Sequence, residues 1–197
     1  MAQDWTGNFR STYSTLGASN HSSEDRQEDD FYATDPKAVE ALLKVEKFSH
    51  YVLEPACGMG HISHTLEQAG YEVISQDKVY RGYGLKETKD FFEIEKIMKM
   101  DIVTNPPYKY AAEFVEHALD IVDEGSKVAM FLKLTFLESV KRLKLFKKYP
   151  PQTVYVFSKR QVCAKNGDFD AANTAAVAYA WFVWKKGFTG DPVIKWL

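Results

Sequence analysis

The chain has 197 residues, 45% of them hydrophobic, and a formal net charge of -2. A chain of this size and composition can bury one core and fits roughly one domain of ~100–200 residues, and its near-neutral charge excludes a protein that holds a polyanion over its whole surface. The sequence also lacks a signal peptide, an apolar run of the ~20 residues that cross a bilayer, and a cysteine and histidine pattern for a structural metal, so we expect a cytoplasmic protein that contacts no membrane.

Residues 1–30 are rich in polar and acidic side chains and end in the stretch SSEDRQEDD. This segment holds little apolar surface that could offset the entropy lost on ordering. We therefore expect a flexible N-terminal arm over residues 1–30 and one folded domain over residues 31–197.

The first expected helix begins after Asp35. Aspartate is a good N-cap, and Pro36 suits the first helical position because a backbone N–H would have no partner there. Val39 and Leu42 follow at helical spacing, so one face of this helix should be buried.

Farther along the chain, short apolar runs alternate with stretches of helical periodicity. The expected strands are 51–55, 71–77, 100–105, 127–133, 153–158 and 175–184, and the later helices are one that follows Gly60 and stops at Gly70, one over 111–122 and one over 134–148. Strands that alternate with helices predict an α/β fold with a mainly parallel sheet covered on both faces.

The stretch EPACGMG, residues 54–60, follows the first of these strands. In an open parallel sheet a ligand binds beyond the carboxyl ends of the strands, and Gly58 and Gly60 let the backbone approach it closely. Asp77 ends the next strand, 19 residues after Gly58, a spacing at which an acid reaches ribose hydroxyls. Ser63 stands where a dinucleotide motif has its third glycine, and no phosphate-binding GK[ST] stretch is present. The site therefore favours a nucleoside without phosphates, such as S-adenosylmethionine, over NAD or ATP.

Asn105, Pro106, Pro107 and Tyr108 stand at the end of the strand expected over 100–105. An exocyclic amine on a base or an amide is a poor nucleophile because its lone pair is delocalised. The side-chain oxygen of Asn105 and the carbonyl of Pro106 could accept the hydrogens of such an amine and aim it at a methyl donor. The prolines fix the backbone and remove competing N–H donors, and Tyr108 could stack on a flat substrate and position it.

Together, EPACGMG, Asp77 and NPPY resemble the amino-methyltransferases of the class I S-adenosylmethionine-dependent superfamily, and among them the DNA adenine methyltransferases with their [DNS]PP[YFW] motif. The stretch FYATDPKAVEALL, residues 31–43, is similar to the segment that in several such enzymes touches the methionine end of the cofactor. The resemblance covers residues 31–184 and extends to compact reading frames of phages and mobile elements, which implies action in a bacterial or phage-infected cell.

This resemblance implies a Rossmann-like class I methyltransferase fold, with a mostly parallel seven-stranded sheet, helices on both faces and an antiparallel final hairpin. It implies methyl transfer from S-adenosylmethionine to the 6-amino group of adenine at specific sites in DNA. The implied roles are catalysis by Asn105, Pro106, Pro107 and Tyr108, and cofactor contact by Thr34, Glu54, Ala56, Gly58, Gly60, Asp77, Asp90, Phe91 and Asn105. For Asp90 and Phe91 a role confined to the fold is an equal alternative.

A base inside a duplex must be turned out and held between flat side chains. Tyr108 would form one wall, and Phe157 would form the other unless it belongs to the core. Lys159 and Arg160 begin a long connection, 159–173, of a kind that usually has a function, and they could contact phosphate. The lysines and arginines of the helix over 134–148 could extend this basic face or form only its solvated side.

Several alternatives stay open. The chain has no room for the large target-recognition domain of site-specific DNA methyltransferases, which predicts specificity for a short site, a homodimer, or a partner that supplies specificity. The same chemistry could act on adenine or guanine in RNA, or on a glutamine side chain of a protein. A non-catalytic cofactor-binding module is a further alternative, although such a module has no need of an intact NPPY.

Overall fold

The computed structural model of the protein describes residues 32–161, 163–165 and 177–197. The expected N-terminal arm over residues 1–30 lies outside the described residues, as does most of the long connection over 159–173. The described ranges all belong to one compact unit, Phe31–Leu197.

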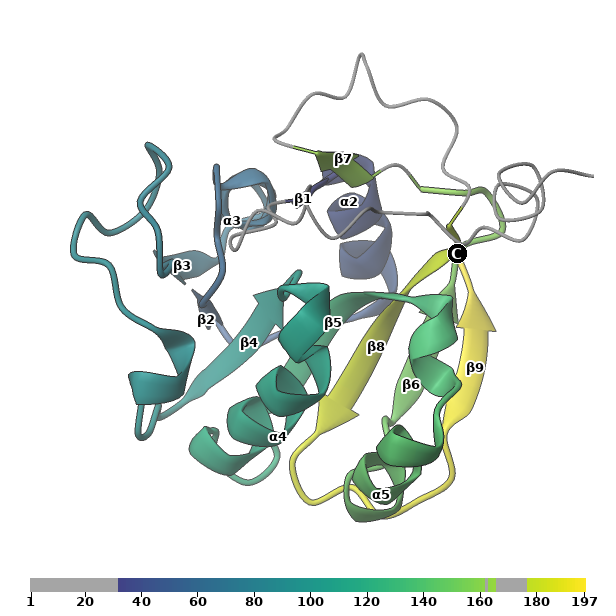
Figure 1. Ribbon diagram of the computed structural model, residues 1–197. Helices are drawn as coiled ribbons and strands as arrows, with labels where there is room; N and C mark the ends of the chain where they lie inside the picture. The colour runs from purple at the N-terminus through teal and green to yellow at the C-terminus, as the bar shows by residue number, and fades with distance from the viewer. Residues whose placement is uncertain (1–31, 162, 166–176) are drawn as a thin grey trace, which may run out of the picture. The chain divides into compact units, whose positions relative to one another are not determined.

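Seven strands form one sheet in the order β3-β2-β4-β5-β8-β6-β9 (Figure 1). Their bounds are β2 Tyr51–Glu54, β3 Glu72–Ser75, β4 Met100–Thr104, β5 Lys127–Lys133, β6 Thr153–Val156, β8 Tyr179–Lys185 and β9 Val193–Trp196. Strand β8 runs antiparallel to its neighbours β5 and β6, and the other neighbouring pairs are parallel. The expected mostly parallel, seven-stranded sheet with an antiparallel pair near its end is confirmed.

Helices cover both faces of this sheet (Figure 1). Helices α2 (Pro36–Val45) and α3 (His61–Gln68) pack on one face, and α4 (Ala111–Ile121) and α5 (Val140–Lys148) pack on the other. Alternation along β5 supplies both cores, because Phe131 belongs to the cluster with α2 and α3 whereas Met130 and Leu132 belong to the cluster with α4 and α5. Within the described ranges, no helix is long and apolar enough to cross a bilayer.

The helix expected over 134–148 is wrong in its first part. Leu134–Leu137 forms a short 3-10 helix, η3, and α5 begins only after Ser139, whose side chain caps it. Arg142 Nε donates to the Phe136 carbonyl at 2.6 Å. The serine cap and this arginine hold a break in a stretch whose apolar spacing alone predicts one continuous helix.

A separate two-stranded sheet lies beyond the carboxyl end of β4 (Figure 1). It consists of β1 (Tyr32–Thr34) and β7 (Cys163–Lys165), which pair antiparallel. Strand β1 leads directly into α2, where the Asp35 side chain accepts the Lys37 N–H at 2.9 Å and confirms the expected N-cap. The small sheet thus joins the segment before the first helix to the connection between β6 and β8.

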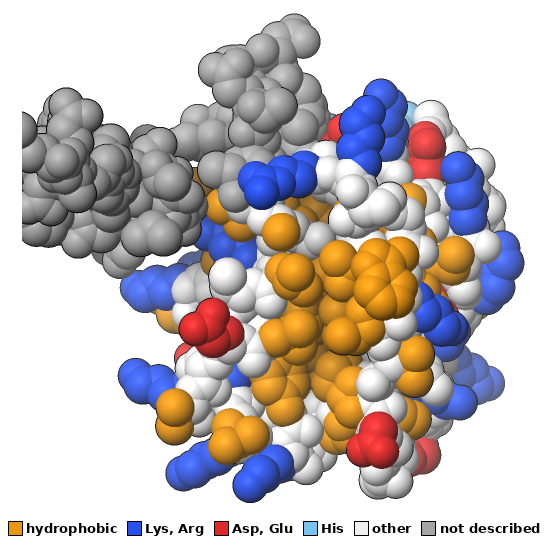
Figure 2. Space-filling model, turned by 90° about the vertical axis from the view of Figure 1, so that its right-hand side faces the viewer, with side chains coloured by type: hydrophobic (Ala, Val, Ile, Leu, Met, Phe, Trp, Pro, Cys, Tyr) orange, Lys and Arg blue, Asp and Glu red, His pale blue; other side chains and the backbone are white. Residues whose placement is uncertain are grey.

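Strand β9 is the seventh strand of the sheet and was not among the six expected from apolar runs. It pairs parallel with β6, and no other described strand pairs with its far edge. Val193 and Ile194 are each 50% exposed, and Trp196 is 71% exposed. Figure 2 shows this side of the molecule, where hydrophobic side chains gather in the middle and lysine and arginine side chains lie around them.

Candidate active site

The carboxyl ends of β2, β3 and β4 meet at one edge of the sheet. The parallel registers of β2 with β3 and with β4, continued past their last pairs, place Ala56 level with Asp77 on one side and Asn105 on the other. The Cys57 N–H donates to the Gln76 carbonyl at 2.9 Å, so the pairing with β3 does continue. Because strands lie ~4.8 Å apart, roughly 10 Å separates the strand of the acid from the strand of the asparagine. A nucleoside can span that gap.

The Asn105 side chain is held by β1. Its Nδ2 donates to the Tyr32 carbonyl at 2.9 Å and to Thr34 Oγ1 at 3.0 Å. Both acceptors engage the amide nitrogen, so they fix the direction of Oδ1, which is buried. Thr34, for which the resemblance implied cofactor contact, is 2% exposed. In the structure the Thr34 hydroxyl orients the Asn105 side chain. Contact of Thr34 with the cofactor stays a prediction.

Tyr108 stands in a group of aromatic side chains. It opens a short 3-10 helix, η2 (Tyr108–Tyr110), that leads into α4. The centroid of its ring lies 5.9 Å from that of Tyr32 and 6.0 Å from that of Tyr179. Lys133 Nζ lies 5.0 Å from the same centroid. Sequence reasoning found Tyr108 and missed these three neighbours.

The residues expected to bind the acceptor follow β6. Because β8 runs antiparallel to both β5 and β6, β6 ends at the same edge as Asn105. Phe157 packs against Phe131, with ring centroids 6.1 Å apart. Lys159 and Arg160 are exposed. The position at the shared edge is compatible with acceptor binding, and the second-wall role of Phe157 stays a prediction.

Asp77 organises the glycine loop. Its Oδ2 accepts the Gly58 N–H at 2.8 Å, and its Oδ1 accepts the Val79 N–H at 2.9 Å and Arg81 Nη1 at 3.2 Å. Gly58 has a φ of 55°, in the left-handed region that favours glycine. A carboxylate offers about four lone-pair sites. These three contacts therefore leave room on Oδ2 for a hydroxyl donor.

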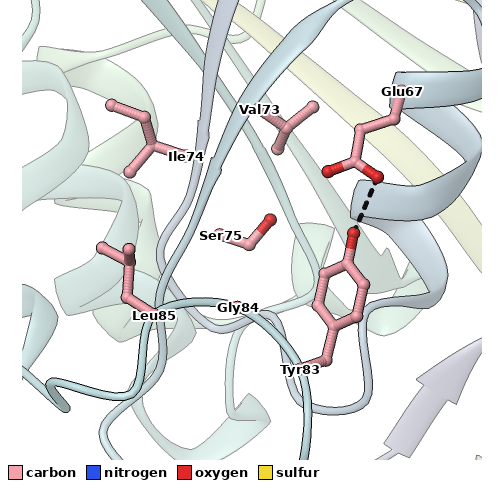
Figure 3. Close-up of a pocket in the computed structure, with 7 residues that line it drawn as sticks. All are labelled: Glu67, Val73, Ile74, Ser75, Tyr83, Gly84 and Leu85. Carbon is pink, nitrogen blue, oxygen red and sulfur yellow. Dashed lines mark hydrogen bonds between the residues drawn. The ribbon is translucent and has the colours of Figure 1, made fainter.

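Gly60 is required by packing within the protein. It has a φ of 82°, and a Cβ at this position would overlap the Tyr83 ring. The Tyr83 hydroxyl donates to Glu67 Oε2 at 2.8 Å, and both residues line a pocket of about 360 Å³ (Figure 3). That pocket lies beside β3 and reaches its carboxyl end, since Val73 and Ser75, the last residue of the strand, both line it. The tyrosine and the left-handed backbone are enough to require glycine here, and contact of Gly60 with the cofactor stays a prediction.

Glu54 lies beneath the glycine loop and is 1% exposed. Ser63 Oγ donates to Glu54 Oε2, and Ser75 Oγ donates to Ser63 Oγ at 2.7 Å. Burial raises the pKa of the Glu54 carboxyl well above its ordinary value, and the hydrogen bonds from Ser63 oppose that rise. Ser63, which replaces the third glycine of a dinucleotide motif, thus serves a buried polar network. Direct contact of Glu54 with the cofactor stays a prediction.

Asp90 and Phe91 follow the loop that leaves β3. This loop returns to its starting point, since the Lys89 N–H donates to the Asp77 carbonyl at 3.2 Å. Asp90 Oδ2 lies 3.1 Å from Lys78 Nζ. Phe91 is 2% exposed and packs with Phe114 at a centroid distance of 4.7 Å. Asp90 is thus brought near Asp77, whereas Phe91 lies in the core, and the cofactor roles of both stay predictions.

The thiol of Cys57, in the glycine loop, is a poor nucleophile. Cys57 is 4% exposed, and burial, followed by the negative charges of Glu54 and Asp77, raises the pKa of its thiol to about 12. Thiolate is the nucleophilic form of cysteine, so Cys57 serves packing rather than covalent catalysis.

No protein-family model matches the chain, and no curated protein matches it in sequence. Solved structures resemble it in fold. A candidate RNA methyltransferase from Pyrococcus horikoshii is 11% identical with a TM-score of 0.60, over 91% of this chain and 98% of that one. The type IIG restriction endonuclease BpuSI is 15% identical with a TM-score of 0.58, over 85% of this chain and 27% of that one. A SAM-dependent O-methyltransferase from Thermotoga maritima is 13% identical with a TM-score of 0.52, over 79% of this chain and 66% of that one. The chain therefore has the Rossmann-like fold of class I methyltransferases.

Proposed function

We propose that the protein transfers the methyl group of S-adenosylmethionine to the 6-amino group of adenine in DNA. The observation that carries this proposal is the fixed orientation of Asn105, whose amide nitrogen is held by Tyr32 and Thr34 at the same sheet edge as Asp77. The roughly 10 Å between their strands suits a nucleoside cofactor on one side of β4 and a flat amine on the other.

The residues at the ends of β2 and β3 fit this cofactor. The lone-pair site that remains on Asp77 Oδ2 can accept a ribose hydroxyl, and the Gly58 backbone at φ 55° brings no side chain into that place. When bound, the cofactor supplies an electrophilic methyl group, and the N–C bond forms as the S–C bond breaks. The favoured site for the cofactor is over β2 and β3, and Asp90 lies next to it.

The acceptor is aimed by the chain's own residues. Asn105 Oδ1 and the Pro106 carbonyl accept the two amine hydrogens, which turns the nitrogen lone pair out of conjugation and toward the methyl group. Since Asn105 Oδ1 is buried in the structure, entry of the base must expose it. Tyr108 stacks on the base, so much of the rate acceleration comes from positioning. The proton that the nitrogen sheds leaves along the hydrogen bond to the Pro106 carbonyl and passes to water.

DNA adenine is favoured as the acceptor by the resemblance of NPPY to the motif of DNA adenine methyltransferases and by the likeness of the fold to part of a restriction endonuclease. RNA is the second candidate, because the likeness with a TM-score of 0.60 is to a candidate RNA methyltransferase. Either acceptor is compatible with the expected action in the cytoplasm of a bacterial or phage-infected cell. Specificity for a site would come from the described edge, from a second copy of the chain, or from a partner.

The experiment offers tritiated S-adenosylmethionine and equal masses of DNA, RNA and protein to the purified chain. The proposal predicts label in DNA, abolished by Asn105→Ala while the variant keeps its cofactor affinity in calorimetry. Label confined to RNA or to protein would exclude DNA as the acceptor. Absence of label from all three pools would contradict the proposal that the protein is a methyltransferase.

A further inference from the structure

Lys133 is the last residue of β5, beside the strand that carries Asn105. The register of β4 with β5, continued past its last pair, places Lys133 level with Pro107. On its other side Lys133 pairs with Tyr179 of β8. Strand β5 lies on the far side of β4 from β2 and β3. Lys133 therefore stands on the acceptor side of the proposed site.

The ammonium of Lys133 lies against the aromatic group around Tyr108. Its Nζ is 5.0 Å from the centroid of the Tyr108 ring, and the residue is partly buried. Among the described residues no carboxylate forms an ion pair with it. Lys127, at the other end of the same strand, has such a partner in Glu46 Oε2 at 2.6 Å. Within the described ranges, a positive charge without a carboxylate partner thus lies beside the residue on which the target base would stack.

Resting on the proposed function, we infer that Lys133 binds the phosphate next to the target base, so that the acceptor is a nucleic-acid strand rather than a free nucleoside or a protein side chain. Lysine is a common phosphate ligand that acts as a point charge. The phosphates that flank a base stacked on Tyr108 lie only one sugar away from it. A lysine that already reaches the Tyr108 ring can reach one of them.

A purely structural role for Lys133 predicts different behaviour. If the ammonium only steadied the Tyr108 ring, its removal would lower kcat and leave the salt dependence of binding unchanged. A phosphate contact instead contributes to affinity for the polyanion and to its salt dependence, because counterions are released from the neutralised phosphate. The two roles can therefore be separated by salt titration.

The test measures fluorescence anisotropy of a labelled single-stranded oligonucleotide with one adenine, with S-adenosylhomocysteine present, for the wild type and three variants. Lys133→Met should weaken binding about tenfold, the effect expected of one charge-assisted contact, and lower the slope of log K against log salt by about 0.7. Lys133→Arg should keep most of the wild-type affinity and most of the wild-type salt slope. Lys195→Met is the matched control, since Lys195 Nζ also lies over a tyrosine ring, 5.7 Å from that of Tyr155, but on β9; its binding should not change.

A second arm replaces the phosphates on either side of the adenine by neutral methylphosphonates. The wild type should lose affinity for this oligonucleotide, whereas Lys133→Met should bind both forms alike. The inference is overturned if the wild type and Lys133→Met show the same salt slope and lose the same affinity on the neutral backbone. It is also overturned if the wild type binds neither a DNA nor an RNA form of the oligonucleotide. These readouts need no turnover. Failed methyl transfer with intact Lys133-dependent binding would therefore overturn the proposed function and leave the phosphate contact of Lys133 standing.

Discussion

Thr34 Oγ1 accepts a hydrogen bond of 3.0 Å from Asn105 Nδ2 and so joins two residues that lie 71 positions apart. The contact ties β1 to the tip of β4. Strand β1 in turn pairs with β7, in the connection between β6 and β8. The direction of the candidate catalytic amide therefore depends on a segment outside the main sheet.

Thr34→Val should lower kcat by about tenfold, because it removes one acceptor of the Asn105 amide, a loss of ~1.4 kcal/mol in its orientation. Steady-state methyl transfer to DNA measures this effect. Thr104→Val is the matched control: Thr104 Oγ1 is buried without a hydrogen-bond partner in the described part of the chain, so its loss should not lower kcat. Equal losses in the two variants would contradict the orienting role of Thr34.

Gly60→Ala should destabilise the fold by about 2–5 kcal/mol, the sum of a left-handed alanine and a steric overlap with the Tyr83 ring. Urea unfolding measures the change. In a Tyr83→Ala background the overlap disappears, and the same substitution should cost only about 1–2 kcal/mol. A cost that does not depend on Tyr83 would show that another contact requires this glycine.

Glu54→Gln should make stability less dependent on pH. Burial raises the pKa of Glu54 in the folded protein above its ordinary value, so folding takes up a proton. The stabilisation is complete below the ordinary glutamate pKa and is lost as pH rises through the raised value. In thermal unfolding, the fall in Tm from pH 5 to pH 8 should therefore be larger for the wild type than for the variant. Parallel curves would argue that Glu54 titrates normally.

Most of the main sheet could be predicted because its strands are apolar and buried. The stretches over 127–133 and 100–105 match β5 and β4 within a residue. Strands β1 and β7 could not, since they have three residues each and pair only with one another, far apart in the sequence. Strand β9 could not, since it is an exposed edge strand and no buried apolar run marks it. Val193, Ile194 and Trp196 are residue types that favour a strand, but four residues without a neighbouring apolar run are too weak a pattern to predict one.

The site residues that belong to sequence motifs could be predicted, whereas those that strand pairing brings to the site were missed. Asp77 and Asn105 stand in motifs. Tyr179 stands in an apolar strand and is typical of a core residue; it reaches the site because β8 runs antiparallel and begins where β5 ends. Lys133 becomes a candidate site residue only because the register of β5 with β4 places it beside Tyr108. A single sequence does not contain that register.

The most direct test of the central claim is mass spectrometry of nucleosides from unmethylated DNA incubated with the protein and S-adenosylmethionine. The account predicts N6-methyldeoxyadenosine with the wild type and none with Asn105→Ala. A methyl group on another base or atom, or DNA left unmodified while RNA or protein gains the label, would contradict it.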